Sequence, residues 1–210
     1  MSNSAWRSVV EVQAKMLGPR LYEAMSVAIP SAEARAKGLA RVKYPHLRPL
    51  IVRCVLRENL EGELLPPGWH VDGNPALMGQ LFLVHPELGL RLRVLKERRK
   101  MDRRAVPHAG RNPVRRRAWQ APLPELSVAG SQPVELLLLW DYAKSDQVGV
   151  VFTLRIVHTT EPGHYGQAIQ CDLELEVEAG GSIFETLSFA GDDDVEDFFH
   201  VDIDQAENDE

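Results

Sequence analysis

The sequence predicts an α+β fold in which N-terminal helices pack on an antiparallel sheet of five to six strands. Apolar residues recur at helical spacing before about residue 65 and at strand spacing after about residue 80. Because the two periods are segregated along the chain, a βαβ arrangement is disfavoured. We expect a helical part over 1–65, a sheet over 80–190 with a long basic loop over 96–133, and an acidic tail over 191–210. Helices and sheet are expected to form one compact domain.

The helical part carries an apolar stripe with spacings of three, four and seven residues. The stripe consists of Trp6, Val10, Leu17, Leu21, Met25 and Ala28. Gly18-Pro19 predicts a break in this helix, because proline has no amide hydrogen to donate. Pro30-Ser31 predicts a stop and a new cap, with a helix over 32–42. Another helix is expected from Pro49 to Gly62, followed by a Pro- and Gly-rich loop over 65–79.

Strand periodicity follows this loop. The expected strands cover 80–84, 88–94, 135–142, 148–158 and 169–178, with a further candidate at 183–189. The segment 169–178 alternates strictly, with Ile169 and Cys171 on the inner face. We expect the inward side chains of these strands to share one core. The predicted core residues are Leu90, Leu92, Val94, Leu138, Val150, Phe152, Leu154, Leu173 and Leu175.

The composition predicts a soluble cytoplasmic protein. Hydrophobic residues make up 44% and charged residues 26% of the 210 positions. No apolar run approaches the roughly 18 residues of a membrane span, and the first residues lack a secretory pattern. Cys54 and Cys171 are expected as buried free thiols, because each lies on an apolar-patterned segment. We therefore expect no contact with a membrane.

Charge is distributed unequally along the chain. Residues 1–117 contain 22 basic and 10 acidic side chains, whereas residues 118–210 contain 2 basic and 20 acidic side chains. Such asymmetry indicates either an electrostatic partner for one half or pairing between the two halves.

The basic residues are densest between Arg91 and Arg117, where 12 of 27 residues are Arg or Lys. Such density suits a nucleic-acid backbone, because each neutralised phosphate releases counterions. An acidic protein partner or the acidic half of the same chain are the alternatives. Trp119 is a candidate for stacking on unpaired bases. The candidate binding residues are Arg91, Arg93, Arg98, Arg99, Arg103, Arg104, Arg111, Arg115, Arg116, Arg117 and Trp119.

The acidic tail is a second candidate interaction segment. Residues 192–210 contain ten acidic and no basic side chains, together with apolar residues that a purely solvated tail does not need. We predict that the tail docks on a basic surface, either the basic segment of this chain or a partner. The residues assigned to this contact are Asp192, Asp193, Asp194, Phe198 and Phe199.

A metal-dependent nuclease is the principal enzymatic alternative. Asp172, Glu174 and Glu176 lie on one face of one predicted strand, and Glu135 or Asp141 could supply a carboxylate from a neighbouring strand. A solvated strand explains the same pattern. The sequence contains no zinc-ligand spacing, HExxH, GxSxG or P-loop pattern, so no metal, cofactor or catalytic residue is assigned.

Two stretches carry a family resemblance: Val106–Pro113 with the following Arg115–Trp119, and Val134–Trp140. In these stretches, and over about residues 80–178, the sequence resembles an uncharacterised group of small actinobacterial and phage-borne proteins encoded beside helix-turn-helix regulators. The resemblance implies a role in a toxin–antitoxin, phage-control or defence module, and assigns no functional residue.

The leading hypothesis is thus a non-enzymatic interaction protein that acts through its charged segments. The expected partner is a protein, with a helix-turn-helix regulator as the candidate, and DNA or RNA is a second expected ligand. A metal-dependent nuclease or another nucleic-acid-processing toxin is the alternative. The oligomeric state is not predicted.

Overall fold

The helical N-terminal part and the strands after it form the architecture that the two sequence periods predict, an α+β fold. The computed structural model describes residues 2–62, 65–100, 103–124, 133–143, 152–164 and 167–180. Its helices are α1 (Ser2–Arg35), α2 (Leu47–Gly62) and α3 (Pro113–Trp119). Its strands are β1 (His70–Asp72), β2 (Phe82–His85), β3 (Leu90–Lys96), β4 (Arg98–Lys100), β5 (Arg103–Ala105), β6 (Val134–Tyr142), β7 (Phe152–Thr159) and β8 (Cys171–Val177).

Six strands form the main sheet, in the order β1-β2-β3-β6-β7-β8. Four of the five neighbouring pairs are antiparallel, but β3 and β6 run parallel, with Leu92 opposite Leu136. The predicted α+β fold with a mostly antiparallel sheet is confirmed, and the parallel pair at its centre is a difference from the expected antiparallel strands. The physical reason is the connection between β3 and β6, which is long enough to cross over the sheet and return in the same direction.

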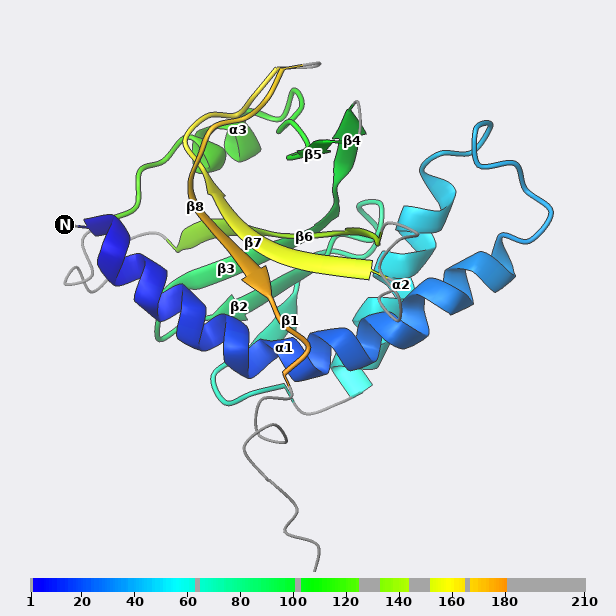
Figure 1. Cartoon of the computed structure of the whole chain (residues 1–210), viewed down its shortest axis with the longest axis horizontal. Helices are drawn as coiled ribbons and strands as arrows, with labels where there is room; N and C mark the ends of the chain where they lie inside the picture. Colours follow the sequence, from blue (N-terminus) through cyan, green and yellow to red (C-terminus); the bar gives the residue numbers. More distant parts are fainter. Residues whose placement is uncertain are drawn as a thin grey trace, which may run out of the picture. The chain divides into compact units, whose positions relative to one another are not determined.

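α1 and α2 cover one face of this sheet (Figure 1). Their buried side chains and the inward residues of β2, β3, β6, β7 and β8 form the larger core. The predicted core is confirmed for seven residues, namely Leu90, Leu92, Val94, Leu138, Phe152, Leu154 and Leu173, and Leu175 packs against it partly buried. Val150 and the candidate strand at 183–189 lie outside the described residues.

α1 runs without interruption through Pro19 and Pro30, so the predicted breaks at both prolines are wrong. The stripe residues on its inner side, such as Leu17 and Leu21, are fully buried on both sides of Pro19. Both prolines are exposed on the outer side, so the carbonyls that lose their amide donors are on the solvated side of the helix. Burial of the continuous stripe outweighs these lost hydrogen bonds. The predicted helix over 32–42 ends at Arg35.

The opposite face of the sheet is covered by the connection between β3 and β6. This connection contains the β4–β5 hairpin and α3, so the expected irregular loop over 96–133 is wrong in part. Trp119, Val106 and Ala109 pack on Leu137, Leu139 and Val157 and form a smaller second core.

Two smaller expectations also fail. Ile169 and Cys171 were expected on the inner face of the sheet with Leu173, but they pack against the second core. The reason is that the register between β7 and β8 shifts at His158 and Thr159. The shift moves the first residues of β8 to the opposite face from Leu173. Both cysteines are free thiols as expected, but neither is fully buried, because Cys54 is exposed and Cys171 is half-buried.

Candidate nucleic-acid interface

The basic segment is anchored to the sheet at its C-terminal end. The Trp119 side chain is 1% exposed, and the Thr159 hydroxyl donates a hydrogen bond of 2.7 Å to the Trp119 carbonyl. The ring therefore lies in the core and cannot stack on a base. The predicted stacking role of Trp119 is wrong, because its helix turns the large apolar ring inward and the arginines of the same helix away from the core.

α3 is built by local signals. Pro113 occupies the first turn, where a missing amide hydrogen is tolerated, and the Asn112 side chain accepts a hydrogen bond of 3.1 Å from the Arg115 amide. The guanidinium of Arg115 donates to the Ala109 carbonyl at 3.3 Å, and that of Arg116 donates to the Gly110 carbonyl at 3.5 Å. These contacts hold two arginines of the helix against the preceding turn.

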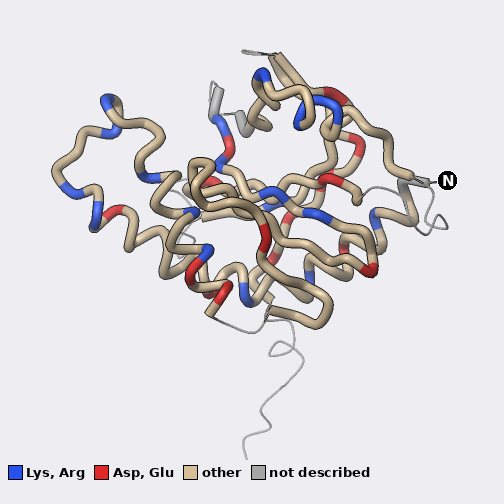
Figure 2. The backbone as a smooth tube through the Cα atoms, turned by 180° about the vertical axis from the view of Figure 1, so that it is seen from behind, with Lys and Arg blue, Asp and Glu red and all other residues tan. Residues whose placement is uncertain are grey.

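Four arginines at α3, namely Arg111, Arg115, Arg116 and Arg117, have no carboxylate within ion-pair distance in the described part of the chain. Arg111 and Arg117 are exposed, whereas Arg115 and Arg116 are half-buried. Figure 2 shows the basic residues of α3 in the upper part of that view. We call these four residues the α3 arginines. On this structured support their guanidinium groups form no ion pair with a carboxylate of the described residues.

Arg91 and Arg93 of β3 have a more structural role than the sequence suggested. Arg91 forms an ion pair of 3.0 Å with Glu135, and its guanidinium lies 3.8 Å from the centre of the Phe82 ring. The Arg93 guanidinium lies 5.1 Å from the same ring. Burial, with the repulsion of Arg115 and other arginines, lowers the pKa of Arg93 to about 10. Arg93 therefore remains charged at neutral pH.

The remaining predicted binding residues lie on the hairpin. Arg98 is exposed at the start of β4. Arg99, Arg103 and Arg104 belong to the paired strands β4 and β5 by their backbone, and their side chains lie outside the described residues. The tail residues Asp192, Asp193, Asp194, Phe198 and Phe199 also lie outside the described residues.

A cavity of about 480 Å³ opens beside the α3 arginines. Its polar lining comes from Arg91 of β3, Arg117 of α3, Glu135 of β6 and His158 of β7. Burial raises the pKa of Glu135, although Arg91 and Arg93 oppose this effect. The cavity thus brings together two arginines of the predicted binding set with a glutamate and a histidine that the sequence did not associate with them.

His158 is held by Asp172. The Nδ1 atom of His158 lies 2.6 Å from a carboxylate oxygen of Asp172, and the histidine side chain is 3% exposed. In the neutral ring this contact places the proton on Nδ1, since a carboxylate can only accept. Within the described residues Nε2 has no protein partner, and the ring lines the cavity.

The acidic residues of the nuclease hypothesis do not form one cluster. Glu135 pairs with Arg91, Asp141 with Lys96, Asp172 with His158 and Glu174 with Arg155. Arg155 also pairs with the buried Glu97; burial lowers the pKa of Arg155, but the two carboxylates outweigh this effect and raise it. Among the residues that the structure describes, no three His, Cys, Asp or Glu side chains are placed to hold one metal ion.

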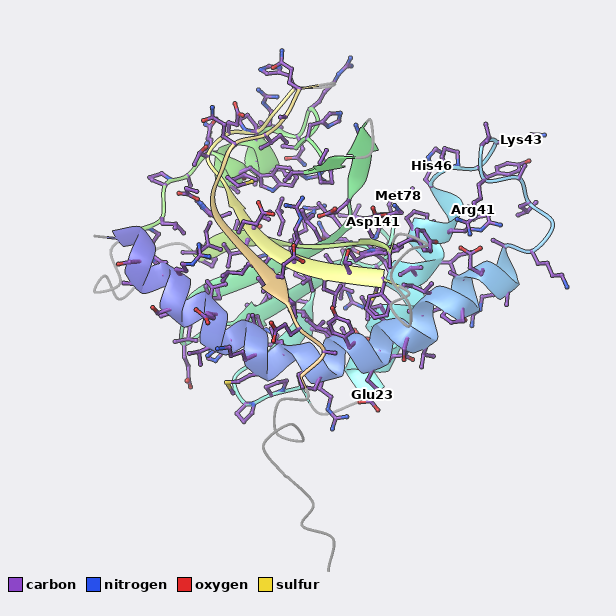
Figure 3. The ribbon with its side chains drawn as sticks, in the orientation of Figure 1. Glu23, Arg41, Lys43, His46, Met78 and Asp141 are labelled. Carbon is purple, nitrogen blue, oxygen red and sulfur yellow. The ribbon has the colours of Figure 1, made fainter. Side chains whose placement is uncertain are left out.

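A second basic surface was not identified from the sequence. The end of α1 and the connection to α2 expose Arg35, Lys37, Arg41, Lys43 and His46, three of which are labelled in Figure 3. The signal was present, because the stretch 35–48 contains five Arg or Lys and no acidic residue. Arg41 and Arg48 both pair with Glu33 at 2.8 Å, which compensates part of this charge.

Asp141 lines a separate cavity of about 390 Å³ near this connection, together with Arg41, Arg48, Lys96 and Tyr142. Glu135 and Asp141 therefore face different cavities.

In the described part of the chain, no helix is both long and apolar enough to cross a membrane.

Comparison with protein-family models, with curated proteins and with solved structures gives no match to this chain.

Proposed function

We propose that this chain is an interaction protein that binds the phosphate backbone of nucleic acid through the α3 arginines. We further propose that it acts without catalysis in a regulatory or defence module, beside a DNA-binding partner such as a helix-turn-helix regulator. The partner proposal rests on the family resemblance of the sequence.

The observation that supports nucleic-acid binding most directly is the charge of the α3 arginines, which form no ion pair within the described residues. Arg111 and Arg117 are exposed and have no acidic partner in the described part of the chain. Trp119 anchors their helix to the sheet, so less conformational freedom is lost on binding than with an unanchored loop. A guanidinium group can donate two parallel hydrogen bonds to the oxygens of one phosphate. Arginine side chains are therefore well suited to bind a phosphate backbone.

The metal-dependent nuclease has less support. Its candidate carboxylates are paired separately with Arg91, Lys96, Arg155 and His158, and two of them line different cavities. A catalytic metal needs several oxygen ligands that converge on one point. The arrangement of these residues therefore favours structural ion pairs.

The direct test is a comparison of two charge-matched double variants by fluorescence anisotropy with labelled DNA and RNA. Arg111→Ser/Arg117→Ser removes two charges at α3, and Lys37→Ser/Lys43→Ser removes two exposed charges from the α1–α2 connection. We expect the α3 variant to bind about tenfold more weakly, a loss of about 1.4 kcal/mol. The matched variant should stay within about twofold of the parent chain. Equal losses in both variants would show that net charge, and not the α3 surface, determines binding.

The partner proposal has a separate test. The full chain is co-expressed with the product of the adjacent gene, and complex formation is measured by size-exclusion chromatography with light scattering. A stable complex is expected. Independent elution of the two proteins at micromolar concentration would contradict the proposed module.

A further inference from the structure

The cavity beside the α3 arginines combines an apolar wall with a cationic rim. Val114, Ala118, Pro122, Pro124 and Pro133 supply small apolar surfaces. Its volume of about 480 Å³ is within the range of small-molecule sites, which is about 300–1,000 Å³. Such a space is larger than a single inorganic phosphate requires and offers both a polar and an apolar contact to one ligand.

The polar side of the cavity is already organised. Asp172 fixes the His158 ring through Nδ1, so the orientation of Nε2 needs no rearrangement on binding. Glu135 and Phe82 together hold the Arg91 guanidinium, by an ion pair of 3.0 Å and a ring contact of 3.8 Å. The cavity therefore has two polar groups that other side chains hold in place before a ligand enters.

The charge balance favours an anion. Arg91 and Glu135 compensate each other, whereas Arg117 has no acidic partner in the described residues. The Arg117 guanidinium therefore supplies the positive charge that remains on the cavity lining, beside the paired Arg91 guanidinium. A phosphomonoester carries a negative charge and three acceptor oxygens, which can accept hydrogen bonds from both the Arg91 and the Arg117 guanidinium groups.

We propose that this cavity binds a nucleoside phosphomonoester, with the phosphate at Arg91, Arg117 and His158 and the nucleoside against the proline and alanine wall. The ligand is either a free mononucleotide or the phosphorylated terminal nucleotide of a strand. The second source rests on the proposed function, because the strand would be held by the α3 arginines beside the cavity.

The first arm of the test uses the full chain and free ligands. Isothermal titration calorimetry compares a nucleoside 5′-monophosphate, its parent nucleoside and inorganic phosphate at equal ionic strength. We expect the monophosphate to bind at least tenfold more tightly than either fragment, because only it reaches both sides of the cavity. Absence of measurable binding at millimolar monophosphate, or equal binding of inorganic phosphate, would overturn the proposal.

The variant arm uses two exposed basic residues that differ in position. Arg117→Gln removes a cavity arginine, and Lys37→Gln removes an exposed charge on the connection between α1 and α2, outside the cavity lining. Arg117→Gln should weaken monophosphate binding about tenfold, as expected for loss of a charged hydrogen-bond donor to phosphate. Lys37→Gln should leave that affinity unchanged. Equal effects of the two substitutions would show that general charge, and not the cavity, attracts the ligand.

The strand arm distinguishes the two sources of the ligand. Two oligonucleotides of one sequence are compared, one with a 5′-phosphate and one with a 5′-hydroxyl. A preference for the phosphorylated strand that Arg117→Gln abolishes identifies the terminal nucleotide as the ligand. If the monophosphate binds and the strands show no difference, the free mononucleotide is the ligand. If strands bind through the α3 arginines but the monophosphate does not bind, the cavity proposal fails and the proposed function stands.

Discussion

The carbonyl oxygen of Glu178 packs against Gly18 of α1, so close that a β-carbon at position 18 would clash with it. The residues after β8 cross the helix here, and the neighbouring Tyr22 hydroxyl donates a hydrogen bond of 2.9 Å to the Val177 carbonyl. The Gly18-Pro19 pair therefore marks a close approach of two backbones and not the end of a helix.

Gly18→Ala should for this reason destabilise the protein. In most helix interiors this change stabilises by about 0.5–1 kcal/mol, but here the methyl group would displace backbone atoms. We expect the free energy of unfolding to fall by about 1–3 kcal/mol, measured by urea denaturation. Gly62→Ala is the control, since nothing lies within 4 Å of its β-carbon position. A Gly18→Ala protein as stable as the parent chain would contradict this packing.

Glu33 links α1 to α2 and β6. Burial raises its pKa, but hydrogen bonds from Tyr142 at 2.9 Å and Arg48 at 2.8 Å, with the charge of Arg41, outweigh burial and lower it. Glu33→Gln should lower the free energy of unfolding at pH 7 by about 1–3 kcal/mol. As pH falls below the ordinary carboxyl value of 4.5, Glu33 in the parent chain becomes protonated and its charged contacts are lost. The difference in unfolding free energy between the parent chain and Glu33→Gln should therefore shrink. A difference that stays constant down to pH 3 would refute the assignment, with Glu23→Gln as the exposed comparison.

The Trp119→Phe variant distinguishes a structural role of Trp119 from base stacking. In Trp119→Phe the ring remains aromatic and buried, and the lost Nε1 donor has no partner in the described residues. We expect a loss of about 1–3 kcal/mol in unfolding free energy and a nucleic-acid affinity within about twofold of the parent chain. Thermal unfolding and anisotropy on the same sample measure both quantities. A large loss of affinity without loss of stability would restore the stacking role.

The sequence predicted those features that depend on local period. Leu90, Leu92 and Val94 alternate with Arg91 and Arg93, and the structure places the two sets on opposite faces of β3. The parallel pairing of β3 with β6 was not predictable in this way, because alternation is the same in parallel and antiparallel strands. The continuity of α1 depends on burial of its stripe against the sheet, which no local signal at Pro19 reveals.

The candidate site was predictable only as a charged segment. The density of arginine between 91 and 117 identified Arg111 and Arg117, which the structure leaves exposed. The cavity depends on contacts between distant parts of the chain, with His158 held by Asp172 from the neighbouring strand. No spacing in the sequence relates these residues to Arg117. The same limit explains Trp119, whose burial depends on Leu137, Leu139 and Val157.

The salt dependence of nucleic-acid binding tests the central claim most directly. The association constant of the full chain is measured by anisotropy over a series of salt concentrations and plotted against salt on logarithmic axes. A linear fall is expected, and Arg111→Ser/Arg117→Ser should flatten the slope by about 2, one for each lost phosphate contact. Lys37→Ser/Lys43→Ser should leave the slope unchanged. Binding that does not weaken with salt, or a slope that the α3 variant leaves unaltered, would contradict phosphate recognition by the α3 arginines.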